Sequence, residues 1–301
     1  LANEASRLET PRSIYPLSTI SEIKEWCYHE GKTFWEYVSD CEGPEIWDYL
    51  DTVWETMCAT IQRGLNNDGV LPGGLKVARK ASTYWVKSKS YTDSLSSRAK
   101  IYAYALATSE ENASGGTVVT APTCGSSGVM PAVLYHLSTS RNFLRIRILR
   151  ALATAGLFGN VAKTNSSISG AEVGCQGEVG VACAMAAAAA CQLFGGTPSQ
   201  IEYAAEMGLE HHLGLTCDPV CGLVQVPCIE RNAIAAARAF DANAYATLSD
   251  GSHMVSFDKV VEVMNETGHA LPSLYRETSE GGLAKRFKRS VSYTHLTLPT
   301  T

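Results

Sequence analysis

The sequence predicts a mainly α-helical fold, arranged as a single domain in which glycine-rich loops connect long helices. Apolar residues recur at a spacing near 3.6 in several long segments. No internal repeat and no regular alternation of strands and helices is present. The one segment typical of a strand is "TVVTAP", residues 117–122. The 301 residues are enough for one large domain.

Helical periodicity and capping signals locate the individual helices. Thr197, Pro198 and Gln200 form the start signal of one helix, because they match an N-cap, a first-turn proline and a capping box. Ser256 is the expected N-cap of another helix, which should stop at Gly268. The periodic segments expected to be helical span residues 46–65, 96–112, 141–160, 179–194 and 229–246.

Composition excludes several classes of protein. A net charge of −5 provides no basic face for nucleic acid or for acidic lipid. The longest apolar run, residues 179–194, is shorter than the roughly 20 residues that a membrane-spanning helix needs. No secretory signal is visible, and several of the ten cysteines lie in alanine-rich helical segments. We therefore expect no membrane association, reduced thiols and a cytoplasmic location.

A Gly-Ser-Ser-Gly turn, residues 125–128, precedes an expected helix. Small residues let backbone N–H groups approach a ligand, and a helix N-terminus favours an anion. Ser126 and Ser127 are therefore candidates for binding a substrate carboxylate; a tight turn with no ligand is the alternative. A pyridoxal-phosphate site would need a Schiff-base lysine, and neither Lys76 nor Lys163 stands in a context that requires this role.

Cysteines are concentrated in "GLTCDPVCGLVQVPCIERN", which contains Cys217, Cys221 and Cys228. A metal site, a reactive thiol, a disulfide and core packing are all possible explanations. No Cys-x-x-Cys pair occurs, which argues against the common zinc and thioredoxin patterns. Asp218-Pro219 and Pro227-Cys228 indicate turns, so these cysteines should lie in loops. Cys228 should begin a helix, where the helix dipole favours the thiolate.

A further cysteine, Cys175, lies in the glycine-flanked "VGCQGEVG", again just before an expected helix. Loop cysteines at helix starts are compatible with an iron–sulfur cluster that keeps one iron open. Structural free thiols remain the alternative, and this interpretation suits five other cysteines better. These are Cys27, Cys41, Cys58, Cys183 and Cys191.

Long stretches of the chain resemble the α, or catalytic, domain of the bacterial iron–sulfur-dependent L-serine dehydratases, also called L-serine ammonia-lyases. The resemblance rests on "NSSISGAEVGCQGEVGVACAMAAAAA", "GLEHHLGLTCDPVCGLVQVPCIERNAIAAARA" and "YRETSEGGLA", and is extended by "LPGGLKVARKA" and "GGTVVTAPTCGSSGVMPAVL". It covers roughly residues 12 to 288. The resemblance implies a lyase that converts L-serine to pyruvate and ammonia, as in amino-acid degradation and gluconeogenesis.

The resemblance also implies a [4Fe–4S] cluster held by Cys175, Cys217 and Cys228, which stand in the "GCQGE", "TCDPV" and "PCIERN" positions. Cys221 and Cys124 stand where the family pattern does not require sulfur. In "PVCGLV" we expect Cys221 to be a small buried apolar residue. With three cysteine ligands, one iron is left open for substrate, where it acts as a Lewis acid on the serine hydroxyl.

The residue that removes the α-proton is not identified. The family carries a Ser-Ser-His-Thr-x-Gly-Pro stretch in a smaller N-terminal or β-type domain, and this stretch does not occur here. Lys163 and Asn165 are weak catalytic candidates, and Ser167 is a candidate for binding the substrate carboxylate. Hydrogen bonds that only stabilise the loop are the alternative for these residues.

The expected organisation follows from where the resemblance begins and ends. Residues 1–15 are expected to be a linker from a missing N-terminal domain, residues 16–290 the cluster-binding catalytic domain, and residues 291–301 a non-native tail. The implied partners are L-serine, the N-terminal or β-type domain and a second copy of the chain in a homodimer. A cysteine desulfidase-like lyase and a non-catalytic metal-stabilised subunit are the alternative functions.

Overall fold

The alanine-rich helix α9 (Val181–Leu193) runs through the centre of the molecule, and nearly all of its residues are buried. The computed structural model describes residues 14–287. Around α9 pack α6 (Val129–Arg141), α7 (Arg145–Asn165), α10 (Pro198–Glu210) and α11 (Cys228–Leu248). Small side chains permit this close packing, because a Cβ on Gly208 of α10 would lie only 3.0 Å from the backbone of Ala184.

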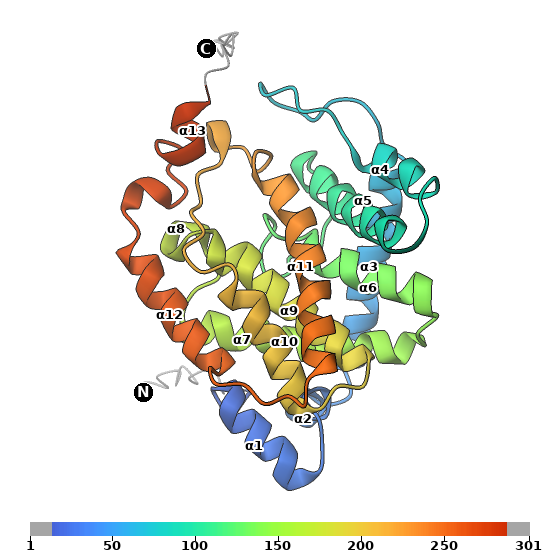
Figure 1. Cartoon of the computed structure of the whole chain (residues 1–301), viewed down its shortest axis with the longest axis vertical. Coiled ribbons are helices and arrows are strands. Elements are labelled where there is room, and N and C mark those ends of the chain that lie inside the picture. The colour runs from blue at the N-terminus through green and yellow to red at the C-terminus, as the bar shows by residue number, and fades with distance from the viewer. Residues whose placement is uncertain (1–13, 288–301) are drawn as a thin grey trace, which may run out of the picture.

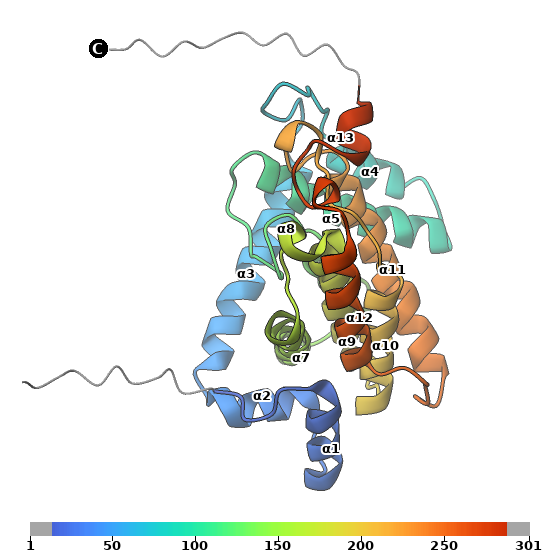
Figure 2. The same ribbon diagram turned by 90° about the vertical axis from the view of Figure 1, so that its left-hand side faces the viewer.

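Two further groups of helices cover this centre (Figures 1 and 2). On one side lie α3 (Ile46–Leu65), α4 (Ala81–Ser88) and α5 (Asp93–Ala113), with α5 packed against α3, α4, α6 and α11. The second group is α12 (Phe257–Ala270) on the opposite side, with α1 (Ile20–Glu30) and α2 (Phe34–Glu42) at the lower end in both views. The Asp258 carboxylate accepts hydrogen bonds of 2.8 Å from the first two backbone N–H groups of α1, which joins α1 to α12.

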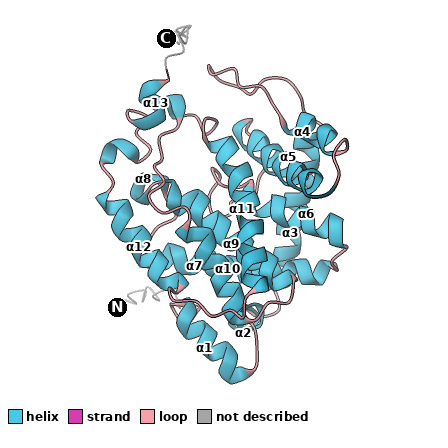
Figure 3. Cartoon of the chain, in the orientation of Figure 1, coloured by secondary structure: helices cyan, strands magenta, loops and turns pink. Residues whose placement is uncertain are grey.

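Short elements occupy the connections that carry the sequence motifs. These are α8 (Gly170–Val173), the π-helix η1 (Gln176–Gly180), the 3₁₀ turns η2 (Val220–Gly222) and η3 (Ser273–Tyr275), and α13 (Gly282–Arg286). Figure 3 shows helices and loops in the described part of the chain, in agreement with the predicted mainly α single domain. None of the described helices combines the length and the apolar character needed to span a lipid bilayer.

Most predicted helices are confirmed, including the one over residues 46–65 and the capping box at Thr197. The helix expected over residues 141–160 instead begins at Arg145, because α6 ends where Asn142 adopts a left-handed φ of 52°. The strand expected at residues 117–122 is wrong. Within residues 14–287 this segment has no strand partner, so its β-branched residues form an irregular loop that ends in Pro122.

The expected linker and tail fall almost entirely outside the described residues. Of the linker, residues 1–15, the structure describes only Ile14 and Tyr15. The tail, residues 291–301, lies wholly outside. Both therefore stay predictions.

Candidate active site

The three cysteines selected from the sequence come together from three separate segments. Cys175 lies between α8 and η1, Cys217 lies in the loop after α10, and Cys228 is the first residue of α11. The Cys175 thiol is hydrogen-bonded to Cys217, and Cys228 is close enough to interact electrostatically with Cys175. None of the ten cysteines is in a disulfide. Figure 1 shows α8, the start of α11 and α13 toward the same end of the molecule.

A backbone segment near the C-terminus holds Cys217. The Cys217 N–H donates to the Tyr275 carbonyl at 2.8 Å, and the Glu277 N–H donates to the Cys217 carbonyl. These bonds form an isolated parallel bridge between Cys217 and Arg276. The Arg276 guanidinium donates to the Glu172 carbonyl at 3.1 Å and so ties the same segment to α8 and its neighbours. Arg276 therefore has a structural role in this site.

Gln176, which follows Cys175, fixes the first cysteine. Its side chain is fully buried; its amide donates to the Val173 carbonyl at 2.8 Å and to the Met264 carbonyl at 3.2 Å. Its amide oxygen accepts from the Gly214 N–H at 2.9 Å. One side chain thus joins α8, α12 and the loop that leads to Cys217, which explains the glutamine of the "GCQGE" motif.

Glu178, three residues after Cys175, places a carboxylate beside the thiols. It accepts a hydrogen bond from the Thr123 hydroxyl at 3.1 Å and lies 3.8 Å from the Cys217 sulfur. Burial, followed by the neighbouring Glu277 carboxylate, raises the pKa of Glu178. A Cβ at Gly170 would lie 2.8 Å from the Glu178 carboxylate and 2.9 Å from the Cys217 sulfur, so only glycine leaves this space open.

Arg231 supplies the positive charge of the site from the first turn of α11. It donates to the Thr216 carbonyl at 2.7 Å. The hydrogen bond from Cys217 lowers the pKa of Cys175, and the Arg231 charge lowers it further. Cys228 begins α11 as predicted, but the expected preference for the thiolate is wrong, because burial raises its pKa to about 12. Loss of hydration outweighs the helix dipole here.

The Gly-Ser-Ser-Gly turn packs against the cysteine segments and is followed by a helix, as predicted. Asn232 is fully buried and holds the turn from both directions: its oxygen accepts from the Gly128 N–H at 2.9 Å, and its nitrogen donates to the Gly125 carbonyl at 2.8 Å. Ser126 pairs with Thr123 at 3.0 Å, and the buried Ser127 hydroxyl has no partner in the described part of the chain.

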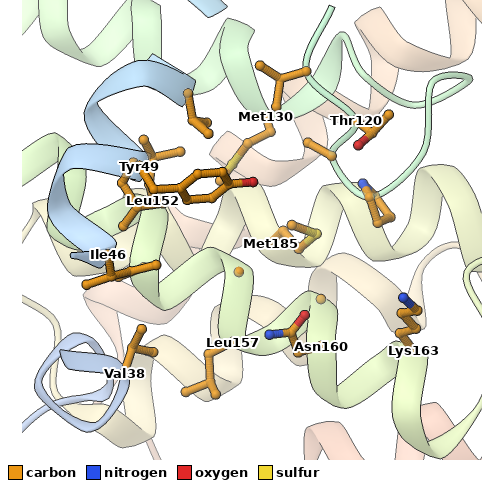
Figure 4. A pocket seen from close by; sticks show the side chains of 18 of the residues that line it. Val38, Ile46, Tyr49, Thr120, Met130, Leu152, Leu157, Asn160, Lys163 and Met185 are labelled. Atoms are coloured by element: carbon orange, nitrogen blue, oxygen red, sulfur yellow. The ribbon is translucent and has the colours of Figure 1, made fainter. Parts of the chain in front are cut away.

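The other polar candidates lie outside the hydrogen-bond network of the cysteines. Ser167 donates to Glu172, which is a bond within its own loop. Asn165 donates to the Ser18 carbonyl at 2.8 Å. Lys163 lines a cavity of about 380 Å³ between α2, α3 and α7, and Figure 4 shows it beside Asn160 on one side of that cavity.

Cys221 differs from the sequence-based expectation. We expected a small buried apolar residue, but the Cys221 side chain is exposed and its backbone has a left-handed φ of 57°. Cys221 lies within the tight turn η2, between Pro219 and Leu223, and this turn directs its side chain to the solvent. Its exclusion from the set of candidate ligands remains a prediction.

Sequence reasoning missed Glu178, Arg231 and Asn232, although each lies in a quoted motif. Glu178 is three residues after Cys175, and Arg231 is three residues after Cys228. In a helix, residues three apart lie on the same face. Applied to Cys175 and Cys228, this spacing would have found both charged residues, Glu178 and Arg231. Asn232 follows at the i+4 position from Cys228.

Known proteins include clear relatives of this chain. Residues 9–284 match the family described as serine dehydratase alpha chain. The chain belongs to this family. It is 52% identical over 242 residues to the L-serine dehydratase of Streptomyces coelicolor, and the aligned region covers 80% of this chain and 53% of that protein. It is 48% identical over 280 residues to L-serine dehydratase 1 of Escherichia coli, and the aligned region covers 90% of this chain and 62% of that protein.

A more distant serine dehydratase, from Helicobacter pylori, is 40% identical over 285 residues, covering 91% of this chain and 62% of that protein. The chain thus spans between about half and two thirds of the length of these serine dehydratases. The family match includes every residue of the site, from Thr123 to Glu277.

Proposed function

We propose that this chain is the catalytic domain of an L-serine dehydratase and that Cys175, Cys217 and Cys228 hold a [4Fe–4S] cluster. The observation that carries the proposal is the convergence of these three unbridged thiols from three segments. The similarity to proteins named L-serine dehydratase supports the same reaction.

The donor set is chemically suited to such a cluster. Thiolate is the preferred ligand of iron–sulfur clusters. Among residues 14–287, no group of three or more histidine, cysteine, aspartate or glutamate side chains is arranged to hold a metal ion. Each cysteine that holds a cluster binds a different iron atom. The three thiols therefore surround a common space and do not need the tight donor arrangement that a single metal ion requires. The glycine at position 170 keeps the space beside Cys217 free of side chain.

When bound, such a cluster supplies a Lewis-acidic iron that assists departure of the serine hydroxyl. The chain's own residues orient the substrate around it. Asn232 holds the Gly-Ser-Ser-Gly turn, and Ser126 and Ser127 of that turn, together with Ser167, are the residues proposed to receive the substrate carboxylate. Arg231 balances the negative charge of the thiolates, and the buried Glu178 carboxyl can hold a proton next to Cys217.

The net reaction removes water from L-serine and forms 2-aminoacrylate. This product tautomerises to an imine, which water converts to pyruvate and ammonia. Removal of the α-proton is assigned to no residue of this chain; Lys163 and Asn165 remain weak candidates. We propose that an N-terminal or β-type domain supplies this base, that the chain acts as a homodimer and that it works in the cytoplasm.

The test begins with the chain purified and reconstituted without oxygen. We expect about four iron and four sulfide ions per chain and a broad visible absorption band. Pyruvate formation from L-serine should be weak for the chain alone and should increase when the N-terminal domain of a related dehydratase is added. Absence of bound iron would contradict the cluster.

The same assay separates the alternative functions. Faster release of sulfide from L-cysteine than of pyruvate from L-serine would indicate a desulfidase instead. Cluster binding without turnover of either amino acid, with the added domain present, would indicate a non-catalytic subunit.

A further inference from the structure

A second cavity, of about 780 Å³, lies between α10, α11 and the loop that joins α11 to α12. It borders the second half of α11, from Arg238 to Tyr245. At a rise of about 1.5 Å per residue, this places it at least roughly 15 Å along the helix from Cys228. The proposed cluster chemistry therefore does not account for this cavity.

Aromatic rings form one wall of the cavity. Tyr203 and His253 stack with their ring centroids 4.6 Å apart and their planes at 5°, while Tyr203 and Tyr245 meet edge-to-face at 6.0 Å. The His253 ring is held in place through Nδ1, which is 2.8 Å from the Gly251 carbonyl oxygen. Aromatic faces attract organic cations, and groups of aromatic residues are used in this way to recognise ammonium groups.

The cavity also contains one carboxylate that is in no ion pair among residues 14–287. Glu206 lines the cavity and is only 6% exposed; its oxygens are not among the fully buried polar atoms without a partner, so they face the open cavity. The neighbouring carboxylates are paired: Asp241 with Arg98 at 2.9 Å, Glu210 with His211 at 2.6 Å, and Glu202 with Lys24.

This environment favours a positively charged ligand at Glu206. Burial first, and then Glu210 and Glu202, raise the pKa of Glu206 to about 7. Arg238, the cationic side chain that lines the same cavity, donates to the His211 carbonyl at 2.6 Å. The partner of this carboxylate in the cavity is therefore water or a ligand, and a cationic ligand would also compensate its charge.

The rest of the cavity indicates the shape of that ligand. Residues 14–287 contain no cluster of donors arranged for a metal ion, and of the three carboxylates that line the cavity Glu210 and Asp241 are paired with His211 and Arg98. Met207, Met254 and Val255 provide apolar surface, and Met254 is fully exposed at the rim. Apolar surface beside one carboxylate suits an alkyl chain that carries a charged amine.

We propose that Glu206, Tyr203 and Tyr245 form a binding site for an alkylammonium group. The ammonium donates to the Glu206 carboxylate and lies against the tyrosine rings, and its alkyl chain contacts the methionines. Free primary amines and the lysine side chain of another protein share this chemistry.

The test follows the methyl resonances of ¹³C-methyl-methionine in the cluster-loaded chain, with the signals assigned by Met207→Leu and Met254→Leu. n-Pentylammonium chloride should shift these signals in a saturable way, whereas 1-pentanol, of the same length but uncharged, should bind at least about tenfold more weakly. Equal binding of pentanol, or no saturation by pentylammonium, would overturn the proposal.

Glu206→Gln keeps the shape of the side chain and removes its charge. We expect it to weaken pentylammonium binding at least about tenfold. The matched control is Glu210→Gln at the exposed rim, which should change binding much less. Unchanged binding by Glu206→Gln would refute the site.

Two further measurements make the result unambiguous. Glu206→Gln should fold with an unchanged or higher Tm, because it removes a carboxylate that is in no ion pair. It should also keep its iron content. A failure of the amine-binding proposal can therefore be told apart from a failure of the cluster assignment. Nα-acetyl-lysine N-methylamide then distinguishes the sources: tighter binding than pentylammonium indicates a protein partner, and weaker binding indicates a free amine.

Discussion

Cys183 in α9 and Cys175 just before that helix are both buried, but their surroundings differ. Around Cys183 the helix is mostly alanine, and burial raises the pKa of its thiol to about 12. Cys175 is hydrogen-bonded to Cys217 and lies near Arg231, and its pKa is lowered instead. Burial alone keeps a thiol neutral, whereas a donor and a positive charge favour the thiolate that binds metal. Neighbouring groups therefore distinguish Cys175 from the core cysteine Cys183, whereas the pKa of Cys217 is raised by its hydrogen bond to Cys175 and that of Cys228 by burial.

The largest expected effect tests this comparison directly. Cys175→Ser, Cys217→Ser and Cys228→Ser each replace a soft sulfur ligand by a hydroxyl, so each variant should lose most of its iron and its visible absorption band. The matched control is Cys183→Ser, which should keep full iron content. Iron and sulfide per chain are measured after reconstitution without oxygen. Full iron content in Cys217→Ser would contradict its assignment as a ligand. Loss of iron in a folded Cys183→Ser would contradict the assignment of Cys183 as a core cysteine.

His212 extends the comparison to another titratable group that is buried without a compensating charge. Burial lowers its pKa from 6.5 to about 4, and its Nδ1 is 2.7 Å from the Gly208 carbonyl oxygen. The unfolded chain then binds more protons below pH 6.5, so the free energy of unfolding should decrease as the pH falls from 6.5 to 4. The loss attributable to His212 is on the order of 3 kcal/mol.

Urea denaturation at several pH values measures this dependence. His212→Leu should reduce the slope of stability against pH in that window, whereas His29→Leu, at an exposed position, should leave it unchanged. An identical slope in His212→Leu and the unmodified chain would contradict the assignment.

Asn232→Ala should have an intermediate effect. It removes the amide that holds the Gly-Ser-Ser-Gly turn to α11 and leaves the buried Gly128 N–H and Gly125 carbonyl without partners. The expected loss is about 2 kcal/mol in the free energy of unfolding. Asn165→Ala is the control: its one hydrogen bond is at the surface, so the loss should be well below 1 kcal/mol. Equal losses would show that the turn does not depend on Asn232.

The smallest effect is expected for Cys221→Ala. Because the Cys221 side chain is exposed, the change in the free energy of unfolding should stay within about 0.5 kcal/mol and the iron content should not change. Thermal denaturation and iron analysis measure both. A loss of iron in this variant would place Cys221 among the ligands.

Local patterns in the sequence were sufficient for most of the helices. Periodicity predicted the helix over residues 46–65, and cap chemistry predicted the start at Thr197. The strand prediction at residues 117–122 failed because strand propensity has no effect without a neighbouring strand. The boundary near Asn142 failed because one left-handed residue separates two helices that share the same periodicity.

The candidate site was predictable only in part. The family resemblance selected three cysteines, and the structure brings them together. The bonds that hold them are not visible in the sequence: Cys217 is fixed by the backbone of Tyr275 and Glu277, nearly 60 residues later in the chain. Likewise, the exposure of Cys221 depends on a tight turn rather than on its apolar neighbours.

The bridge between Cys217 and the segment around Arg276 has a thermodynamic consequence. The Cys217 backbone exchanges hydrogen bonds with residues 275–277, and the Asp218 carboxylate accepts from the first helical turn of α13 at Leu283. By mass action, any ligand that binds only the folded arrangement of Cys217 also stabilises the segment bonded to it. Hydrogen exchange at Cys217 and Glu277 should therefore slow when the thiol is occupied, so these amides would report occupancy of the site without a measurement of turnover.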